Sequence, residues 1–227
     1  MATDQTAQID WRDGGIPVSA RFDDPYYSLQ NGLEETRHVF LAGNGLPARF
    51  RDGFTIAELG FGTGLNLLAA WEAWEVSGIK GTLNFTSFEA FPITAPDMAH
   101  ALTGFPELAN KAQALAQAWD TGARRFTLGP VGVEVIVGDA RQTLPTWTGR
   151  ADAWFLDGFS PAKNPELWNP ALMTEVGQHS APGGSFATYT AAGHVRRALE
   201  DAGFQVERRA GFGRKRHMTT GQMEPAP

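Results

Sequence analysis

Residues 54–66 read FTIAELGFGTGLN, and the expected fold follows from this stretch. An apolar run typical of a buried strand leads into Gly60, Gly62 and Gly64, and a helical pattern follows. Glycines permit a tight turn and let a ligand come close to the backbone. Glu58 precedes the turn, and the third glycine comes one residue earlier than in the G-x-G-x-x-G dinucleotide fingerprint. The loop therefore favours a nucleoside with an amino-acid tail over a pyrophosphate, with a plain strand–helix turn as the alternative.

On either side of this loop, apolar runs alternate with helical patterns. The expected strands are residues 54–59, 83–88, 131–137, 151–156, 185–189, 204–209 and 213–219. The expected helices are residues 65–76, 107–119, 165–178 and 191–202. This alternation predicts an α/β fold, with a mainly parallel seven-stranded sheet covered by helices on both faces. Ligands of such sheets bind at the carboxyl ends of the strands, near the switch in strand order.

The chain divides into three parts by composition. Residues 1–52 are rich in Asp, Gly, Pro and aromatic residues, and predict an extension packed on the core, with a helix near residues 33–42. Residues 53–219 form the main domain, and residues 220–227 are expected to be a disordered tail.

Composition excludes some classes of function. The 227 residues include no cysteine, so disulfides and thiolate metal sites are excluded, and the five histidines lack metal-ligand spacing. We expect no metal site. No apolar run reaches the roughly 18–20 residues of a membrane span, and a cytoplasmic location is expected. The net charge is −6, but residues 207–217 read ERRAGFGRKRH, a basic segment that is either a solvated face or a contact for RNA.

Three acidic residues end successive strands of the predicted sheet. Glu89 follows the second strand, at the distance from the glycine loop where a carboxylate accepts hydrogen bonds from ribose hydroxyls. Asp139 follows the third strand, and its side chain suits either an adenine amine or the N-cap of a helix. Asp157 follows the fourth strand, beside a loop restricted by two prolines, Pro161 and Pro165. Aromatic residues flank that loop, and Phe159 and Trp168 are candidates for stacking on a base.

Seven segments together resemble a known family. They read FDDPYYS, ELGFGTGLN, SFEAFP, GDARQTLP, DAWFLDGFSPAKNPELW, FATYTAAGHVRRAL and GFGRKRHM. The chain from about residue 11 to about residue 218 is similar to the methyltransferase part of the bifunctional enzymes that make 5-methylaminomethyl-2-thiouridine at the tRNA wobble position. The resemblance implies a Rossmann-like class I methyltransferase fold, S-adenosyl-L-methionine as methyl donor, and the aminomethyl nitrogen of a modified uridine in a tRNA anticodon stem-loop as acceptor.

The resemblance also suggests a role for each candidate residue. The expected cofactor-binding residues are Glu58, Gly60, Gly62, Gly64, Asn66, Glu89, Asp139 and Asp157. The expected catalytic residues are Asp157, Phe159 and Asn164. The expected substrate-binding residues are Tyr26, Tyr27, Ser160, Lys163, Trp168, Arg214 and Lys215. Our hypothesis is that Asp157 accepts a hydrogen bond from the acceptor amine, orients it, and takes or relays its proton, while residues 160–164 shape the pocket.

One departure from the family leaves alternatives open. The bifunctional enzymes carry a flavin-dependent oxidase that first removes a carboxymethyl group, and residues 1–227 match only the methyltransferase half. Either a separate FAD-dependent oxidase is a partner, or the acceptor differs. Two other classes share this fold: an NAD-dependent oxidoreductase, and a catalytically silent module that binds RNA or a protein partner.

Overall fold

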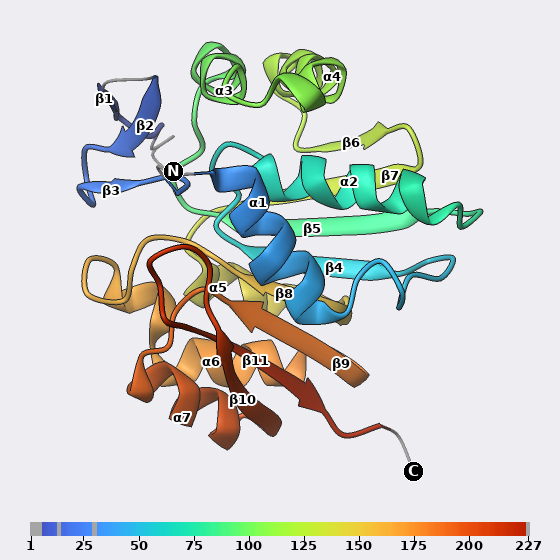
Figure 1. The fold of residues 1–227 in the computed structure, drawn as a ribbon, viewed down its shortest axis with the longest axis vertical. Coiled ribbons are helices and arrows are strands. Elements are labelled where there is room, and N and C mark those ends of the chain that lie inside the picture. Colours follow the sequence, from blue (N-terminus) through green and yellow to red (C-terminus); the bar gives the residue numbers. More distant parts are fainter. Residues whose placement is uncertain (1–5, 13–14, 29–30, 226–227) are drawn as a thin grey trace.

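The computed structural model describes residues 6–12, 15–28 and 31–225. Its centre is an eight-stranded sheet in the order β10-β11-β9-β8-β4-β5-β7-β6 (Figure 1). Five neighbouring strands run parallel: β9 (Ser180–Thr188), β8 (Ala151–Leu156), β4 (Thr55–Leu59), β5 (Leu83–Glu89) and β7 (Val131–Val137). The α/β fold expected from the sequence is confirmed, as is the mainly parallel sheet.

The parallel strands are apolar on both sides because helices cover both faces of the sheet. In β8, Ala153 and Phe155 belong to one core cluster, whereas Trp154 and Leu156 belong to the other. All four side chains are fully buried. Successive residues of a strand point to opposite faces, so this continuous apolar run builds two cores at once.

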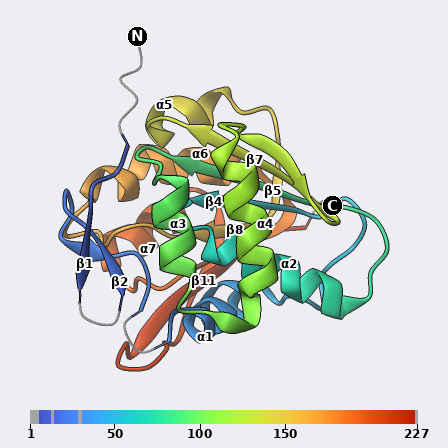
Figure 2. The same ribbon diagram turned by 90° about the horizontal axis from the view of Figure 1, so that it is seen from above.

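One set of helices covers one face of the sheet and a second set covers the other, and residues 32–41, described below, also pack on the first face (Figures 1 and 2). The first set is α2 (Leu65–Ser77), α3 (Ala95–Leu102) and α4 (Ala109–Asp120). The second set is α5 (Ala140–Thr143), α6 (Pro170–Gln178) and α7 (Gly193–Asp201). Strand order reverses at β4, since β5 and β7 follow on one side of it and β8 and β9 on the other. The switch point therefore lies between β4 and β8, where the glycine loop and Asp157 emerge.

The sheet departs from the sequence prediction at its edges. An eighth strand, β6 (Arg125–Leu128), pairs antiparallel with β7. The predicted tail is wrong for residues 220–223, which form the end of β11 (His217–Met223) between β9 and β10 (Phe204–Ala210). Gly221 explains the close pairing, because a Cβ there would lie 2.2 Å from the ring of Phe186. Residues 226–227 lie outside the described part of the chain.

The predicted helix over residues 165–178 is interrupted. A 3₁₀ turn (Pro165–Trp168) ends before α6, and Asn169 between them has an extended backbone. A residue that precedes proline disfavours helical dihedrals, and Pro170 follows here. The Asn169 side chain instead caps α6 by accepting a hydrogen bond of 2.9 Å from the Leu172 amide.

The N-terminal residues pack on the core. β1 (Ile9–Arg12), β2 (Ile16–Ser19) and β3 (Asp24–Pro25) form a small antiparallel sheet. The expected helix near residues 33–42 is confirmed: α1 (Gly32–Thr36) continues as a π-helix (Arg37–Leu41) and a 3₁₀ turn (Ala42–Asn44). The domain boundary at residue 52 stays a prediction.

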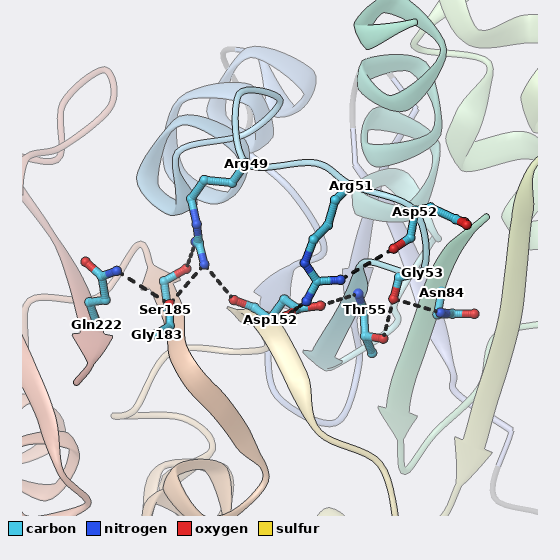
Figure 3. A network of polar contacts seen from close by, with 10 residues as sticks. All are labelled: Arg49, Arg51, Asp52, Gly53, Thr55, Asn84, Asp152, Gly183, Ser185 and Gln222. Carbon is cyan, nitrogen blue, oxygen red and sulfur yellow. Dashed lines mark hydrogen bonds and ion pairs between the residues drawn. The ribbon is translucent and has the colours of Figure 1, made fainter. Parts of the chain in front are cut away.

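Arg49 anchors this extension to the amino ends of the parallel strands (Figure 3). Its guanidinium donates to the Ser185 hydroxyl and to the backbone oxygens of Asn44, Asp152 and Gly183, the last three at 2.8–3.1 Å. The side chain is half-buried, and burial lowers its pKa. Arg51 beside it is 61% exposed and pairs with the Asp152 carboxylate.

We expect Arg49→Met to lower the free energy of unfolding by about 2–4 kcal/mol, because it leaves several partly buried carbonyls without a donor. Urea denaturation followed by circular dichroism measures this change. Arg51→Met is the matched control and should cost less than about 1 kcal/mol, since an exposed ion pair contributes little. Equal losses in the two variants would contradict the anchoring role of Arg49.

Candidate active site

A cavity of about 1850 Å³ opens at the carboxyl ends of β4, β5, β7 and β8. Single-ligand pockets occupy roughly 300–1,000 Å³, so this cavity has room for two ligands side by side. Most residues predicted from the sequence line it: Tyr26, Tyr27, Gly60, Gly62, Asn66, Glu89, Asp139, Asp157, Phe159, Ser160, Lys163, Asn164, Arg214 and Lys215. Glu58, Gly64 and Trp168 are not among its lining residues.

The glycine loop requires glycine because its backbone takes conformations that residues with side chains disfavour. Gly60, Gly62 and Gly64 have φ angles of 84°, 53° and 79°. A Cβ on Gly60 would lie 3.1 Å from the backbone of Gly158, so the two strand-end loops touch. Gly64 is buried, and a Cβ there would meet Leu115 of α4 at 2.6 Å. The structure thus corrects the prediction for Gly64. This residue faces α4 and lets the glycine loop pack closely against that helix, and it does not face the cavity.

Glu89 holds the glycine loop in place. Its carboxylate accepts hydrogen bonds from the backbone amides of Gly62 at 2.9 Å and Phe91 at 2.7 Å. Burial raises the pKa of Glu89, and the amide hydrogen bonds oppose that rise. The backbone amides of Phe61 and Ala90 also favour its ionised form, so the carboxylate is held by the glycine loop and by the residues that follow β5.

Asp139 caps α5, as one of its two predicted roles required. Its carboxylate accepts from the Arg141 amide at 2.9 Å and from the Arg141 guanidinium through both oxygens. The hydrogen bonds from Arg141 lower the pKa of Asp139. The carboxylate also lines the cavity, and its predicted contact with a base amine stays a prediction.

Asn66 connects two acidic side chains at the floor of the cavity. Its amide nitrogen donates to Glu58 at 2.9 Å and to Asp157 at 2.8 Å, while its oxygen accepts from the Thr36 hydroxyl at 2.8 Å. The hydroxyl of Ser87 donates to the other oxygen of Glu58 at 2.6 Å.

Glu58 is fully buried below this floor, and burial raises its pKa well above the usual range. The prediction that Glu58 contacts the cofactor is therefore corrected, because Glu58 reaches the cavity only through Asn66.

Asp157 is half-buried at the end of β8 and faces the cavity. Loss of hydration raises its pKa to about 6, against the opposing hydrogen bonds from Asn66 and from the Gly158 amide at 2.8 Å. A carboxyl group with this pKa is largely ionised at neutral pH and is a better proton acceptor than an ordinary aspartate.

The loop after Asp157 packs against the N-terminal extension. The ring of Phe159 stacks on Phe22 with 4.8 Å between centroids and meets Tyr26 edge-on at 5.2 Å. The Ser160 amide donates to Asp24 at 2.8 Å. Lys163 donates to the backbone oxygen of Asp23, so part of its hydrogen-bonding capacity is used within the chain.

Trp168 and Tyr27 both make contacts within the protein, and the substrate contact predicted for Tyr27, which lines the cavity, stays a prediction. Trp168 is 1% exposed in the second core, and its indole donates to the Phe159 oxygen at 2.8 Å. It therefore supports the loop from below, which corrects the prediction that it stacks on a base. Tyr27 donates to the Ala101 oxygen at 2.9 Å, packs against Phe105, and has a pKa raised to about 12 by burial.

The structure adds residues that the sequence analysis missed. Thr36 and Glu35 come from α1, far from any motif, and lie close to Asn66 and Lys215 respectively. Tyr189 follows β9, and its hydroxyl donates to the Gly158 oxygen at 2.8 Å. Tyr189 lies in the segment FATYTAAGHVRRAL, so the family resemblance could have identified it. No sequence motif pointed to Glu35 or Thr36.

The described residues form neither a metal-binding cluster nor a membrane-spanning helix. Among residues 6–12, 15–28 and 31–225, no group of three or more His, Asp or Glu side chains is placed to hold a metal ion. Within the same ranges, no helix combines the length and apolar character needed to cross a membrane.

Comparison with known proteins gives one family match and several close relatives. The family model described as S-adenosyl-L-methionine-dependent methyltransferase matches residues 106–224. The tRNA 5-methylaminomethyl-2-thiouridine biosynthesis bifunctional protein MnmC of Ectopseudomonas mendocina is 50% identical over 242 residues, which cover 100% of this chain and 36% of that protein. MnmC of Pseudomonas aeruginosa is 46% identical over 238 residues, with the same coverage. The chain thus spans about a third of the length of these relatives.

Two solved structures share the fold. MNMC2 from Aquifex aeolicus superimposes with a TM-score of 0.77 at 26% identity, over 98% of this chain and 73% of that chain. TrmN from Thermus thermophilus superimposes with a TM-score of 0.51 at 19% identity, over 82% of this chain and 47% of that chain. The first match extends over nearly the whole chain, including the N-terminal residues that contact the cavity.

We expect Asp157→Asn to stabilise the protein by about 1–3 kcal/mol at pH 8, because the folded state disfavours the ionised carboxylate. The pKa of Asp157 is raised in the fold, so its ionisation penalty is absent below the unfolded pKa of about 3.9 and complete above pH 6. The stability gain should therefore grow from about pH 4 to pH 6 and then level off. Urea denaturation at pH 3.5, 5 and 8 measures it, and a gain independent of pH would refute this assignment.

Proposed function

We propose, from the premise that this chain belongs to the family of S-adenosyl-L-methionine-dependent methyltransferases, that it methylates the aminomethyl nitrogen of 5-aminomethyl-(2-thio)uridine at the tRNA wobble position. The observation that carries the proposal is Asp157, half-buried at the switch point with a pKa of about 6, beside a cavity with room for donor and acceptor. The names of the relatives support RNA as the substrate class.

The residues around the glycine loop fit an adenosyl group with an amino-acid tail. The backbones of Gly60 and Gly62 line the cavity without side chains, so a ligand can approach them closely. Glu89 lines the cavity at the end of β5, where a carboxylate can contact ribose hydroxyls, and Asp139 lies at the end of the neighbouring strand for the adenine amine. When bound, S-adenosyl-L-methionine supplies an activated methyl group on a sulfonium.

Asp157 prepares the acceptor nitrogen. An alkylamine has a pKa of about 10, so at neutral pH it arrives mostly protonated. Asp157 takes a proton from it or relays that proton to solvent, and holds the free amine by a hydrogen bond. The raised pKa of Asp157 lies closer to the pKa of the alkylammonium ion, so proton transfer from the ammonium ion to Asp157 costs less free energy. Asn66 fixes the carboxylate so that the amine approaches in one orientation.

The rim of the cavity suits an RNA loop. Phe159 and Tyr26 offer aromatic faces beside Asp157, and bases splayed from a loop stack on such faces. Asn164 lines the same wall, and its backbone N–H donates to the backbone oxygen of Ser160 at 2.9 Å, which closes the loop. Arg214 and Lys215 lie at the tip of the β10–β11 hairpin, where cations meet phosphates.

Two other expectations belong to this proposal. A separate FAD-dependent oxidase supplies the free aminomethyl group, and the protein acts in the cytoplasm. The alternative of an NAD-dependent oxidoreductase loses its basis, because the family is one of methyltransferases. A catalytically silent module remains the outcome to test against.

We expect the purified chain to transfer a labelled methyl group from S-adenosyl-L-methionine to tRNA that carries 5-aminomethyl-2-thiouridine. Loss of a proton acceptor typically costs 10²–10⁴-fold in rate, so we expect a fall of about that size in Asp157→Asn. Binding of S-adenosylhomocysteine, measured by calorimetry, should weaken by less than about tenfold. Arg51→Met, far from the cavity, is the control with unchanged rate.

Each negative result of this experiment contradicts a different part of the proposal. If the protein binds S-adenosylhomocysteine but methylates no tRNA, the acceptor is wrong. If it does not bind S-adenosylhomocysteine, the donor is wrong as well. If Asp157→Asn turns over normally, another group prepares the amine.

A further inference from the structure

The ammonium group of Lys215 lies inside the cavity, between an acidic and an aromatic side chain. Its Nζ is 2.9 Å from a carboxylate oxygen of Glu35 and 4.2 Å from the centroid of the Tyr189 ring. Asp157 is close enough for its charge to affect Tyr189, and both Glu35 and Lys215 affect Asp157. The four side chains come from α1, β8, β9 and the β10–β11 hairpin, and all line the same cavity.

The two partners of the Glu35–Lys215 ion pair differ in burial. The side chain of Glu35 is 12% exposed, whereas that of Lys215 is 47% exposed. A carboxylate removed from water is costly unless a cation or hydrogen-bond donor accompanies it. In the described part of the chain, the side-chain partner found for Glu35 is Lys215. The cation arrives on a long flexible side chain from an exposed hairpin, and a half-exposed pair of this kind contributes about 1 kcal/mol or less. Another ammonium group can therefore replace it.

We propose that Glu35, Asp157 and Tyr189 form the recognition site for the ammonium group of the methyl acceptor, and that Lys215 occupies this site until the acceptor displaces it. The inference rests on the proposed function in one respect, namely that the acceptor is an alkylamine. It adds Glu35 and Tyr189 as specificity-determining residues and assigns Lys215 the role of a placeholder.

The chemistry of the site matches an alkylammonium ion on a short chain. Glu35 lies 2.9 Å from the position that the Lys215 ammonium group marks, Asp157 adds its negative charge from beyond ion-pair distance, and the face of Tyr189 attracts cations through its quadrupole. Tyr189 keeps its ring in place by donating its hydroxyl to the Gly158 oxygen. Burial raises the pKa of Tyr189 well above its usual value, so the ring stays neutral.

The methyl transfer needs the bound ammonium ion, the Asp157 carboxylate and the methyl donor. The bound ammonium gives one proton to the Asp157 carboxylate, which becomes a carboxylic acid. The nitrogen lone pair then forms the new bond to the methyl carbon, while the carbon–sulfur bond breaks and its electron pair stays on sulfur. The product is a secondary ammonium ion, and Asp157 releases its proton to solvent. Lys215 returns to Glu35 as the product leaves.

The site also discriminates against amines that carry a nearby carboxylate. Such a group would bring a third negative charge next to Glu35 and Asp157, with Lys215 displaced. Like charges at close range in a partly desolvated site oppose binding.

A binding experiment tests the placeholder directly. In Lys215→Ala the site is vacant and Glu35 lacks its partner, so we expect a lower melting temperature than in the parent protein. Ethylammonium chloride at ten times its dissociation constant should raise that temperature by about 3–6 °C, because it binds only the folded state. Glycine, which has the same ammonium group with a carboxylate attached, should give no such rise.

Two controls make the result specific. Sodium chloride at the same ionic strength shows the general effect of salt, and the double variant Glu35→Gln, Lys215→Ala shows binding without the carboxylate charge. The proposal requires the ethylammonium effect to exceed both. An equal rise with sodium chloride, or an equal rise in the double variant, would overturn it.

Kinetics give a second and independent test, which also serves if Lys215→Ala does not fold. Glu35→Gln keeps the shape of the side chain and should raise KM for the tRNA acceptor by about 10–100-fold, the loss expected for a hydrogen bond to a charged group. Its kcat and its affinity for S-adenosylhomocysteine should stay close to those of the parent. A fall in kcat with unchanged KM would overturn the recognition role. If no tRNA is methylated at all, the proposed function fails, while the ethylammonium experiment still reports on the site.

Discussion

The side-chain amide of Asn66 is the interaction on which the site depends. Its nitrogen has two hydrogens, and each is donated to a different carboxyl group, those of Glu58 and Asp157. Two acidic side chains this close would repel if both were ionised, and burial keeps the pKa of Glu58 high. The amide oxygen is held in turn by Thr36 from the N-terminal extension. One residue of α2 thus links two central strands to the N-terminal extension, and sets the position of the Asp157 carboxylate.

This constraint makes the N-terminal extension part of the site. It supplies Thr36 to Asn66, Asp24 to the loop after β8, and Tyr26 to the aromatic wall. Arg49 fastens the same extension to the opposite ends of the strands. Pinning it at both ends of the sheet limits how far the wall of the cavity can move. A cavity built from a rigid sheet and a fastened cover keeps the near-attack geometry that methyl transfer requires.

Sequence reasoning predicted what depends on periodicity and on strand ends. The parallel strands, the glycine loop and the side chains of Glu89 and Asp157 follow from patterns that lie within a few residues. It failed where long-range packing decides: Gly64 turned toward Leu115, and Trp168 turned under its loop. Residues 220–223 lacked a strand pattern because β11 is buried between two neighbours and carries polar residues there. Glu35 was missed because of the same dependence on long-range packing, since only the folded chain brings it to Lys215.

The distribution of charge is compatible with the anionic substrate proposed for this acidic protein. The chain carries a net charge of −6, yet its carboxylates gather at the floor of the cavity while arginines and Lys215 gather at the exposed hairpin. Cations at a rim attract a polyanion and orient its approach. Carboxylates at the floor repel its phosphates and admit a group of opposite charge. The combination would favour a polyanion that carries an ammonium ion, and the proposed tRNA substrate has both properties.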